Sequence, residues 1–152
     1  MKQVADLEEI KRLIPHRHPF LFVDEVDVSS GTIKGRKRFD TDEFFFEGHF
    51  PGMPVVPGVI LVESMAQCGG VGTRLLGLGG PGTYLFAKVK EARFRRAVLP
   101  GDCLEIDVEI IKASPAIVHE RGKGYVDGEL AVEAEWIAIV GPESTGSKGA
   151  SQ

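Results

Sequence analysis

Alternation of aliphatic and acidic residues dominates the last third of the chain and predicts β-structure there. Along one stretch every second position is aliphatic: Leu104, Ile106, Val108 and Ile110. Acidic residues stand between them, which predicts a strand with one buried face. Two more strands are expected at 117–126 and 129–140, because Asp127-Gly128 between them favours a tight hairpin turn. Together with a long strand predicted within 83–98, these segments predict a four-stranded antiparallel meander.

The first third of the chain predicts a short helix followed by two strands. Asp6 and Glu9 form an aspartate version of the capping box, and Pro15 ends the helix. The aromatic and β-branched run at 19–28 predicts a strand, which a Ser-Ser-Gly turn connects to a second strand at 32–39. The glycine- and proline-rich segment that follows is irregular but apolar, so we expect it to pack onto the rest of the protein.

A long helix is predicted from Pro57-Gly58 onward, where VILVESMAQCGGVGTRLL continues for about five turns. Nearly every side of this helix is apolar or small, which is typical of a helix that is buried all round. Glycines are costly inside a helix, on the order of 1 kcal/mol each relative to alanine. We expect close approach of other backbone to compensate at three of them: Gly69, Gly70 and Gly72.

The order of these elements favours an α+β fold, in which a curved antiparallel sheet wraps around one long central helix. A chain of 152 residues fits one domain and is long enough to bury a core. We therefore expect a single domain over residues 1–140. The small, polar residues 141–152 are expected to form a disordered tail.

Composition excludes some classes of protein but indicates no catalytic or binding residue. A formal net charge of -4 and a pI near 5.6 argue against a nucleic-acid binder, which needs a surplus of Lys and Arg. The first residues lack the apolar core of a signal peptide, and no apolar run is long enough to span a membrane. Cys68 and Cys103 lack the spacing of a disulfide framework, so we read them as reduced and expect a cytoplasmic protein.

Two titratable residues stand out in the most apolar part of the chain. His49 precedes the predicted helix and Glu63 lies inside it, where burial is expected to favour the neutral carboxyl group. An acid beside an imidazole base, with free amides near Gly58 at the helix N-terminus, suits proton abstraction next to a carbonyl and loss of water. From the residues alone, a structural histidine and a core carboxylate paired with Gln67 remain alternatives.

Three motifs in order then identify a family. GHFPGMPVVPGVILVESMAQ (48–67), the upstream PHRHPFLFVDEV and the downstream KEARFRRAVLPGD strongly resemble the bacterial (3R)-hydroxyacyl-[acyl-carrier-protein] dehydratases of fatty-acid synthesis. The resemblance covers about residues 13–140 and implies the hot-dog fold. A sister group that also isomerises the double bond carries Asp at the acid position, so Glu63 favours plain dehydration.

The resemblance also implies a role for each site residue. His49 would be the base that takes the C2 proton, and Glu63 the acid that acts on the 3-hydroxyl group. The amide of Gly58 would bind the thioester carbonyl, the carbonyl of Val55 would fix the His49 tautomer, and Gln67 would hold Glu63. No cofactor is implied.

Partners follow from the resemblance as well. Family members act on substrates attached to acyl carrier protein, and they are homodimers whose two subunits share each active site, often assembled into trimers of dimers. The basic run at 88–96 is either a solvated strand face or a landing surface for the acidic carrier, with Arg95 and Arg96 as candidate contacts. His16 and His18 match no common zinc spacing, so no metal is expected.

Two other functions remain open at this point. A thioesterase would use Glu63 to activate water, but this chemistry gives no role to a base that faces C2. A non-catalytic module that binds acyl carriers would not need both titratable groups.

Overall fold

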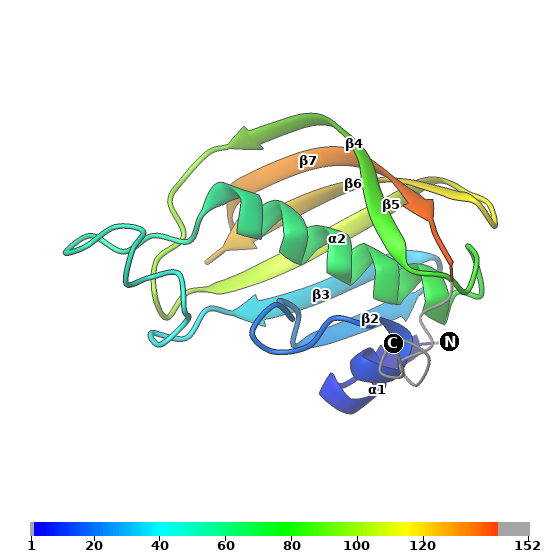
Figure 1. Cartoon of the computed structure of the whole chain (residues 1–152), viewed down its shortest axis with the longest axis horizontal. Helices are drawn as coiled ribbons and strands as arrows, with labels where there is room; N and C mark the ends of the chain where they lie inside the picture. The colour runs from blue at the N-terminus through cyan, green and yellow to red at the C-terminus, as the bar shows by residue number, and fades with distance from the viewer. Residues whose placement is uncertain (1, 143–152) are drawn as a thin grey trace, which may run out of the picture.

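The computed structural model describes residues 2–142, which form one antiparallel sheet and two helices (Figure 1). In chain order the elements are β1 (Lys2–Ala5), α1 (Leu7–Leu13), β2 (Glu25–Ser29), β3 (Thr32–Arg38), α2 (Gly58–Leu75), β4 (Tyr84–Phe94), β5 (Cys103–Ala113), β6 (Ile117–Val126) and β7 (Glu129–Val140). Most of the tail expected at 141–152 lies outside the described residues. Across residues 2–142, no helix combines the length and the apolarity needed to cross a bilayer.

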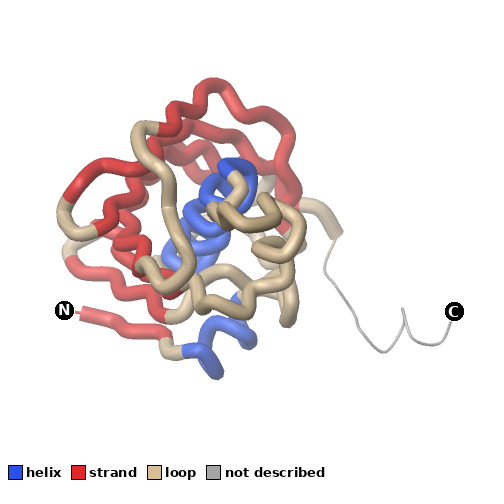
Figure 2. The backbone as a smooth tube through the Cα atoms, turned by 90° about the vertical axis from the view of Figure 1, so that its left-hand side faces the viewer, coloured by secondary structure: helices blue, strands red, loops and turns tan. Residues whose placement is uncertain are grey.

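The sheet curves around α2, which confirms the expected hot-dog architecture. Its strands follow the order β1-β2-β3-β5-β6-β7-β4, and every neighbouring pair is antiparallel. Seen from the side, the strands pass around the helix while loops cross its remaining face (Figure 2). Met65, Cys68 and Val71 on α2 are fully buried, as expected for a helix that is wrapped by a sheet.

The predicted four-stranded meander is wrong in one pairing. β5, β6 and β7 are consecutive neighbours, but β4 pairs with β7 at the far edge of the sheet. β5 lies instead beside β3, with Ile33 opposite Val108. Alternation shows which face of a strand is buried, but it does not specify the neighbouring strand, because that choice depends on how the chain crosses the helix.

The hairpin between β6 and β7 is confirmed at the predicted residues. Asp127 and Gly128 have φ angles of 51° and 79°. A two-residue turn with positive φ at both positions matches the right-handed twist of the flanking strands. The sequence therefore specified this hairpin locally.

The strand predicted at 19–28 begins later than expected. Residues 19–24 are irregular because Phe22 bonds to side chains of α2 rather than to a neighbouring strand. Its N–H donates to Gln67 Oε1 at 2.7 Å, and its carbonyl accepts from Ser64 Oγ at 2.6 Å. The short β1, which pairs with β2, was not predicted.

Both helices begin where the sequence predicts. The Asp6 carboxylate accepts the N–H of Glu9 at 3.0 Å and caps α1.

The interior glycines of α2 face side chains. The expectation that the backbone of another segment would approach them closely is therefore wrong. A Cβ atom on Gly69 would lie 2.3 Å from Glu120 Oε1, and one on Gly72 would lie 2.4 Å from Ile33 Cγ2. Glycine at these positions makes room for residues of the sheet.

The irregular segment between β3 and α2 is anchored at its start, as its apolar character predicts. Phe45 and Phe46 are buried in the core. The buried Lys37 lies 3.0 Å from a carboxylate oxygen of Glu43 and 5.5 Å from the centre of the Phe39 ring. The start of the segment that carries His49 is therefore held against the sheet.

Candidate active site

His49 lies in the segment between β3 and α2, and a backbone carbonyl defines its tautomer. Its Nδ1 atom is 3.0 Å from the carbonyl oxygen of Val55. Because a carbonyl can only accept a hydrogen bond, Nδ1 carries the proton and Nε2 presents a lone pair. The ring also stacks on Phe50, with 4.1 Å between the ring centres. His49 is thus oriented to act as a base through Nε2.

The N-terminus of α2 opens into the same cavity as His49. Gly58, Phe94 and Val59 line this cavity together with His49 and Val55. Within the described chain, no side chain caps the helix at Pro57, so its first amides and the positive end of its dipole are available to an incoming oxygen. A Cβ atom on Gly58 would lie 2.8 Å from the Phe94 ring, which explains the need for glycine there.

Glu63 lies on α2, where a network of fixed donors positions it. Gln67 Nε2, one turn further along, donates to Glu63 Oε2 at 2.8 Å. Gln67 is itself held by the N–H of Phe22 at 2.7 Å and the carbonyl of Phe20 at 3.0 Å. His16 Nε2 lies 3.4 Å from the same Glu63 oxygen. Glu63 therefore has a fixed place between α2 and the segment that precedes β2.

The environment of Glu63 corrects the expectation of a neutral carboxyl group. Burial raises its pKa, but the hydrogen bonds from His16 and Gln67 lower it and outweigh burial, so that the pKa lies below its ordinary value. The sequence did not indicate His16 as a neighbour of Glu63, because the two residues lie far apart in the chain and no spacing rule links them. In this subunit Glu63 is ionised at neutral pH.

One subunit does not bring His49 and Glu63 into one cavity. His49, Val55 and Gly58 line the first cavity, whereas Glu63 and Gln67 line a second one. The second cavity is completed by residues from the segment before β2, from α2 and from three strands: Ile14, Pro15, His16, Ala66, Gly70, Arg74, Tyr84, Phe86, Glu120, Trp136 and Ala138. The sequence-predicted residues thus lie in two separate cavities of the chain.

Arg95 and Arg96 follow β4 and line the cavity that contains His49. Each is paired with a carboxylate: Arg95 Nε lies 2.7 Å from Glu133, and Arg96 Nη1 lies 3.2 Å from Glu129. Their side chains remain partly exposed, at 46% and 26%. Both are therefore available at the mouth of the His49 cavity, although their charge is partly neutralised.

Glu120 is a buried carboxyl group that sequence reasoning missed. It lies on β6 and is only 2% exposed. Thr73 Oγ1 donates to it at 2.7 Å and Trp136 Nε1 at 3.1 Å. Burial raises the pKa of Glu120 to about 7, although both hydrogen bonds lower it. A signal was present, because alternation along β6 places Glu120 on the same inward face as Val118.

The Glu120→Gln substitution is expected to remove a pH dependence of stability. An acid whose pKa is higher in the folded chain than its ordinary 4.5 binds more protons when folded, so its contribution is complete below about pH 4.5 and is lost as the pH rises through about 7. Between pH 4.5 and 8, the free energy of unfolding of the wild type should fall on the order of 3 kcal/mol relative to the variant. Urea denaturation at several pH values and one protein concentration measures this difference.

The exposed Glu8 provides the matched control. Glu8→Gln is expected to leave the pH profile of the wild type unchanged. A Glu120→Gln variant whose stability parallels that of the wild type from pH 5 to 8 would show that Glu120 titrates normally.

Comparisons with known proteins identify relatives over nearly the whole chain. The model of the FabA-like domain matches residues 14–135. A protein of Pelotomaculum thermopropionicum named 3-hydroxyacyl-[acyl-carrier-protein] dehydratase FabZ is 47% identical over 140 residues, which cover 90% of this chain and 99% of the relative. A protein of the same name from Desulforamulus reducens is 43% identical and covers 91% and 99% of the two chains.

Solved structures share the fold at low sequence identity. The dehydratase heterocomplex ApeI:P from Xenorhabdus doucetiae aligns with a TM-score of 0.58 and 19% identity, over 73% of this chain and 89% of that chain. A hypothetical thioesterase with coenzyme A from Streptococcus pneumoniae TIGR4 aligns with the same TM-score of 0.58 and 13% identity, over 78% and 84%. Since dehydratases and thioesterases both appear, this likeness supports the fold alone.

Proposed function

The chain belongs to the FabA-like family, and from this premise we propose that it dehydrates (3R)-3-hydroxyacyl thioesters on acyl carrier protein to trans-2-enoyl thioesters in fatty-acid biosynthesis. The observation that carries this proposal is the 43–47% identity to dehydratases named FabZ over about nine-tenths of the chain. The reaction removes a proton from C2 and the hydroxyl group from C3 and forms the double bond between them, with water as the second product.

His49 is proposed to take the C2 proton. The hydrogen bond from Nδ1 to the Val55 carbonyl leaves the Nε2 lone pair as the basic site. The amide of Gly58, on the wall of the same cavity, is proposed to bind the thioester carbonyl. As C2 loses its proton, negative charge grows on that carbonyl oxygen, and an amide at the positive end of α2 stabilises it.

Glu63 is proposed to deliver a proton to the departing 3-hydroxyl group, while Gln67 holds its carboxyl group in place. An acid needs its proton, yet His16 and Gln67 lower the pKa of Glu63 in the free subunit despite burial. We infer that the bound acyl chain shifts this balance, because it excludes water and so adds to the desolvation that favours the neutral form. In the reverse direction, ionised Glu63 would accept a proton from the attacking water.

A homodimer is proposed to complete each site, with His49 from one subunit and Glu63 from the other. The separation of these residues into two cavities supports this arrangement. So does β4, which is an edge strand of the described sheet and exposes large apolar side chains: Leu85, Phe86, Val89 and Phe94. An edge of this kind favours pairing with a second strand. We further propose, on the family resemblance, that three dimers assemble into a hexamer.

The acyl carrier protein is proposed to dock near Arg95 and Arg96. Both residues line the cavity into which the thioester must enter. Charges at the rim of an interface mainly speed the encounter between partners, so their role would be to guide an acidic carrier.

Product analysis tests the proposed function. We expect the purified protein to bleach the ultraviolet absorbance of trans-2-enoyl-acyl-carrier-protein by hydration, without release of thiol. Thiol release in step with the loss of absorbance would instead establish a thioesterase. An unchanged substrate, under conditions in which carrier binding is detected, would indicate a non-catalytic binding module.

A further inference from the structure

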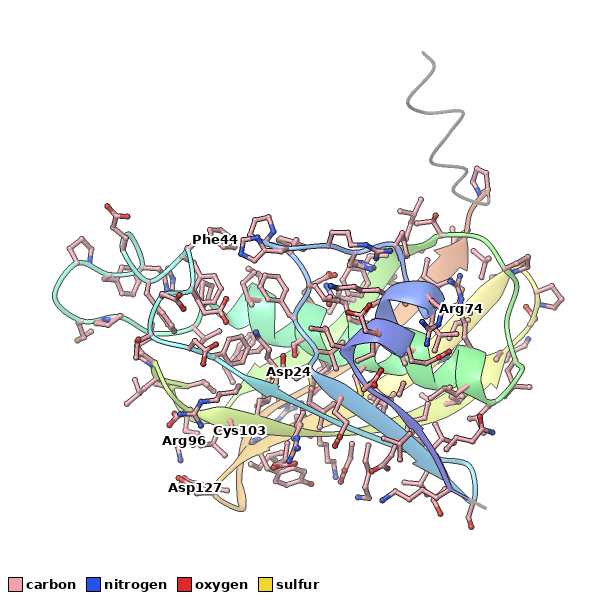
Figure 3. The ribbon with its side chains drawn as sticks, turned by 90° about the horizontal axis from the view of Figure 1, so that it is seen from below. Asp24, Phe44, Arg74, Arg96, Cys103 and Asp127 are labelled. Atoms are coloured by element: carbon pink, nitrogen blue, oxygen red, sulfur yellow. The ribbon has the colours of Figure 1, made fainter. Side chains whose placement is uncertain are left out.

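Two arginines hold the chain segment that carries His16, between α1 and β2. Arg17 donates to the carbonyl oxygen of His16 at 2.7 Å and to that of Lys11 in α1 at 2.9 Å. Arg74 of α2 donates to the carbonyl of Leu13 and lies beside α1 (Figure 3). The backbone of His16 is therefore tied to the end of α1, and the end of α1 is tied to α2.

The imidazole ring of His16 makes one polar contact within residues 2–142. Its Nε2 atom lies 3.4 Å from Oε2 of Glu63. Its Nδ1 atom is buried and has no hydrogen-bond partner. A buried polar atom without a partner costs stability, so packing alone would favour an apolar side chain at this position. The contact with Glu63 is therefore the feature of the fold that requires a histidine.

The two oxygens of the Glu63 carboxylate have different surroundings. Oε2 meets two nitrogens, His16 Nε2 at 3.4 Å and Gln67 Nε2 at 2.8 Å. Because an ionised carboxylate can only accept, both nitrogens present a hydrogen to it. Across the part of the chain that the structure describes, no donor reaches Oε1, although Glu63 lines a cavity. Oε1 is therefore the oxygen that is free to carry a proton to a substrate.

We propose that His16 is a positioning residue of the dehydration reaction: with Gln67 it binds Oε2 of Glu63, so that Oε1 delivers the proton to the 3-hydroxyl group. The inference rests on the proposed dehydratase function and adds a residue to the same site. The proton leaves Oε1 for the hydroxyl oxygen as the C3–O bond breaks, and the electrons of the C2–H bond form the double bond. His49 holds the C2 proton, and the two donors at Oε2 stabilise the negative charge that remains on Glu63.

The protonation of Glu63 supports this role. Burial raises the pKa of Glu63, and the hydrogen bonds from His16 and Gln67 lower it, because they stabilise the carboxylate more than the neutral acid. Three other titratable side chains line the same cavity, one each from α2, β4 and β6: Arg74, Tyr84 and Glu120. These three do not contribute to the shift. Loss of the His16 donor should therefore raise the pKa of Glu63.

Two substitutions that differ in the reach of one amide group test the donor. Glutamine places its amide nitrogen near the position of His16 Nε2, whereas the shorter asparagine places it near that of Nδ1. We would measure kcat/KM from about pH 4 to pH 9, because this ratio reports the pKa values of the free enzyme. We expect the part of the profile that depends on Glu63 to move to higher pH in His16→Asn and to stay near its wild-type position in His16→Gln. Since the pKa of Glu120 is about 7, the same comparison in a Glu120→Gln background isolates the contribution of Glu63.

The rate at saturating substrate tests positioning separately. If the bound acyl chain already keeps Glu63 protonated, loss of the donor no longer changes how much acid is present. His16→Asn should then lower kcat by about tenfold, because a hydrogen bond to the carboxylate that forms in the transition state is lost. His16→Gln should retain most of the wild-type kcat. In a Glu63→Gln background the acid is absent, so His16→Asn should change kcat by less than about twofold.

His18 provides the matched control. It lies two positions further along the same segment, is exposed and does not line the cavity of Glu63. His18→Asn is expected to keep the kcat and the pH profile of the wild type. Thermal unfolding checks the fold of each variant, and His16→Leu, which also lacks a donor, replaces His16→Asn if the asparagine variant does not fold.

Three results would overturn the proposal. One is a His16→Asn variant with the kcat and pH profile of the wild type. The others are a loss that His16→Gln does not restore and an equal loss in the Glu63→Gln background, because both would trace to packing and not to a donor at Oε2. In all three cases turnover by the wild type leaves the proposed function standing. Absence of turnover by the wild type would overturn both.

Discussion

Glu63→Gln and His49→Ala are each expected to lower kcat by several orders of magnitude without unfolding the protein. A positioned general acid or base contributes about 10²–10⁴-fold, and here each substitution removes one of the two proton-transfer groups. Glutamine keeps the size of Glu63 and can still bond to Gln67, so its effect reports the lost proton. Steady-state dehydration rates with one 3-hydroxyacyl-acyl-carrier-protein substrate measure both losses.

A histidine and a glutamate on the sheet, away from both cavities, serve as controls. His119→Ala removes a contact of 2.6 Å with Glu135, and Glu109→Gln removes the charge from a contact of 3.2 Å with Arg121. Both controls are expected to retain the kcat of the wild type. Thermal unfolding of all four variants checks that lost activity does not reflect lost structure. Near-normal turnover by either site variant would refute the role assigned to that residue.

Mixing the two inactive variants is expected to restore about a quarter of the activity of the wild type. If each site takes His49 from one subunit and Glu63 from the other, a mixed dimer contains one intact site and one site that lacks both groups. Random exchange between equal amounts makes half of the dimers mixed, and half of their sites intact. The measurement is the dehydration rate of the mixture after denaturation and joint refolding.

Subunit exchange needs its own readout in this experiment. Sequential purification on two different affinity tags selects assemblies that contain both variants. A mixed dimer should have about half of the activity of the wild type, and a hexamer of randomly paired dimers about a quarter on average. A pure mixed dimer without activity would show that His49 and Glu63 act from the same subunit. The two cavities of the single chain would then have to merge by a change of conformation.

The sequence determined features whose physical cause is local. The first-turn bond of Asp6 fixes the start of α1, and Pro57-Gly58 fixes the start of α2. Asp127-Gly128 fixes the hairpin, because these two residues accept positive φ. Motif resemblance, which is also read along the chain, supplied the family and the candidate acid and base.

Only the tertiary structure decided how distant segments meet. The pairing of β4 with β7, the contact of His16 with Glu63 and the lowered pKa that results all join residues far apart in the sequence. Alternation along β6 indicates that Glu120 faces inward, but only its burial in the folded chain raises its pKa. Propensity, capping and turn chemistry act over a few residues, whereas solvation and hydrogen bonding depend on every group that the fold brings near. The sequence could therefore indicate the candidate acid and base of this protein, but not their surroundings.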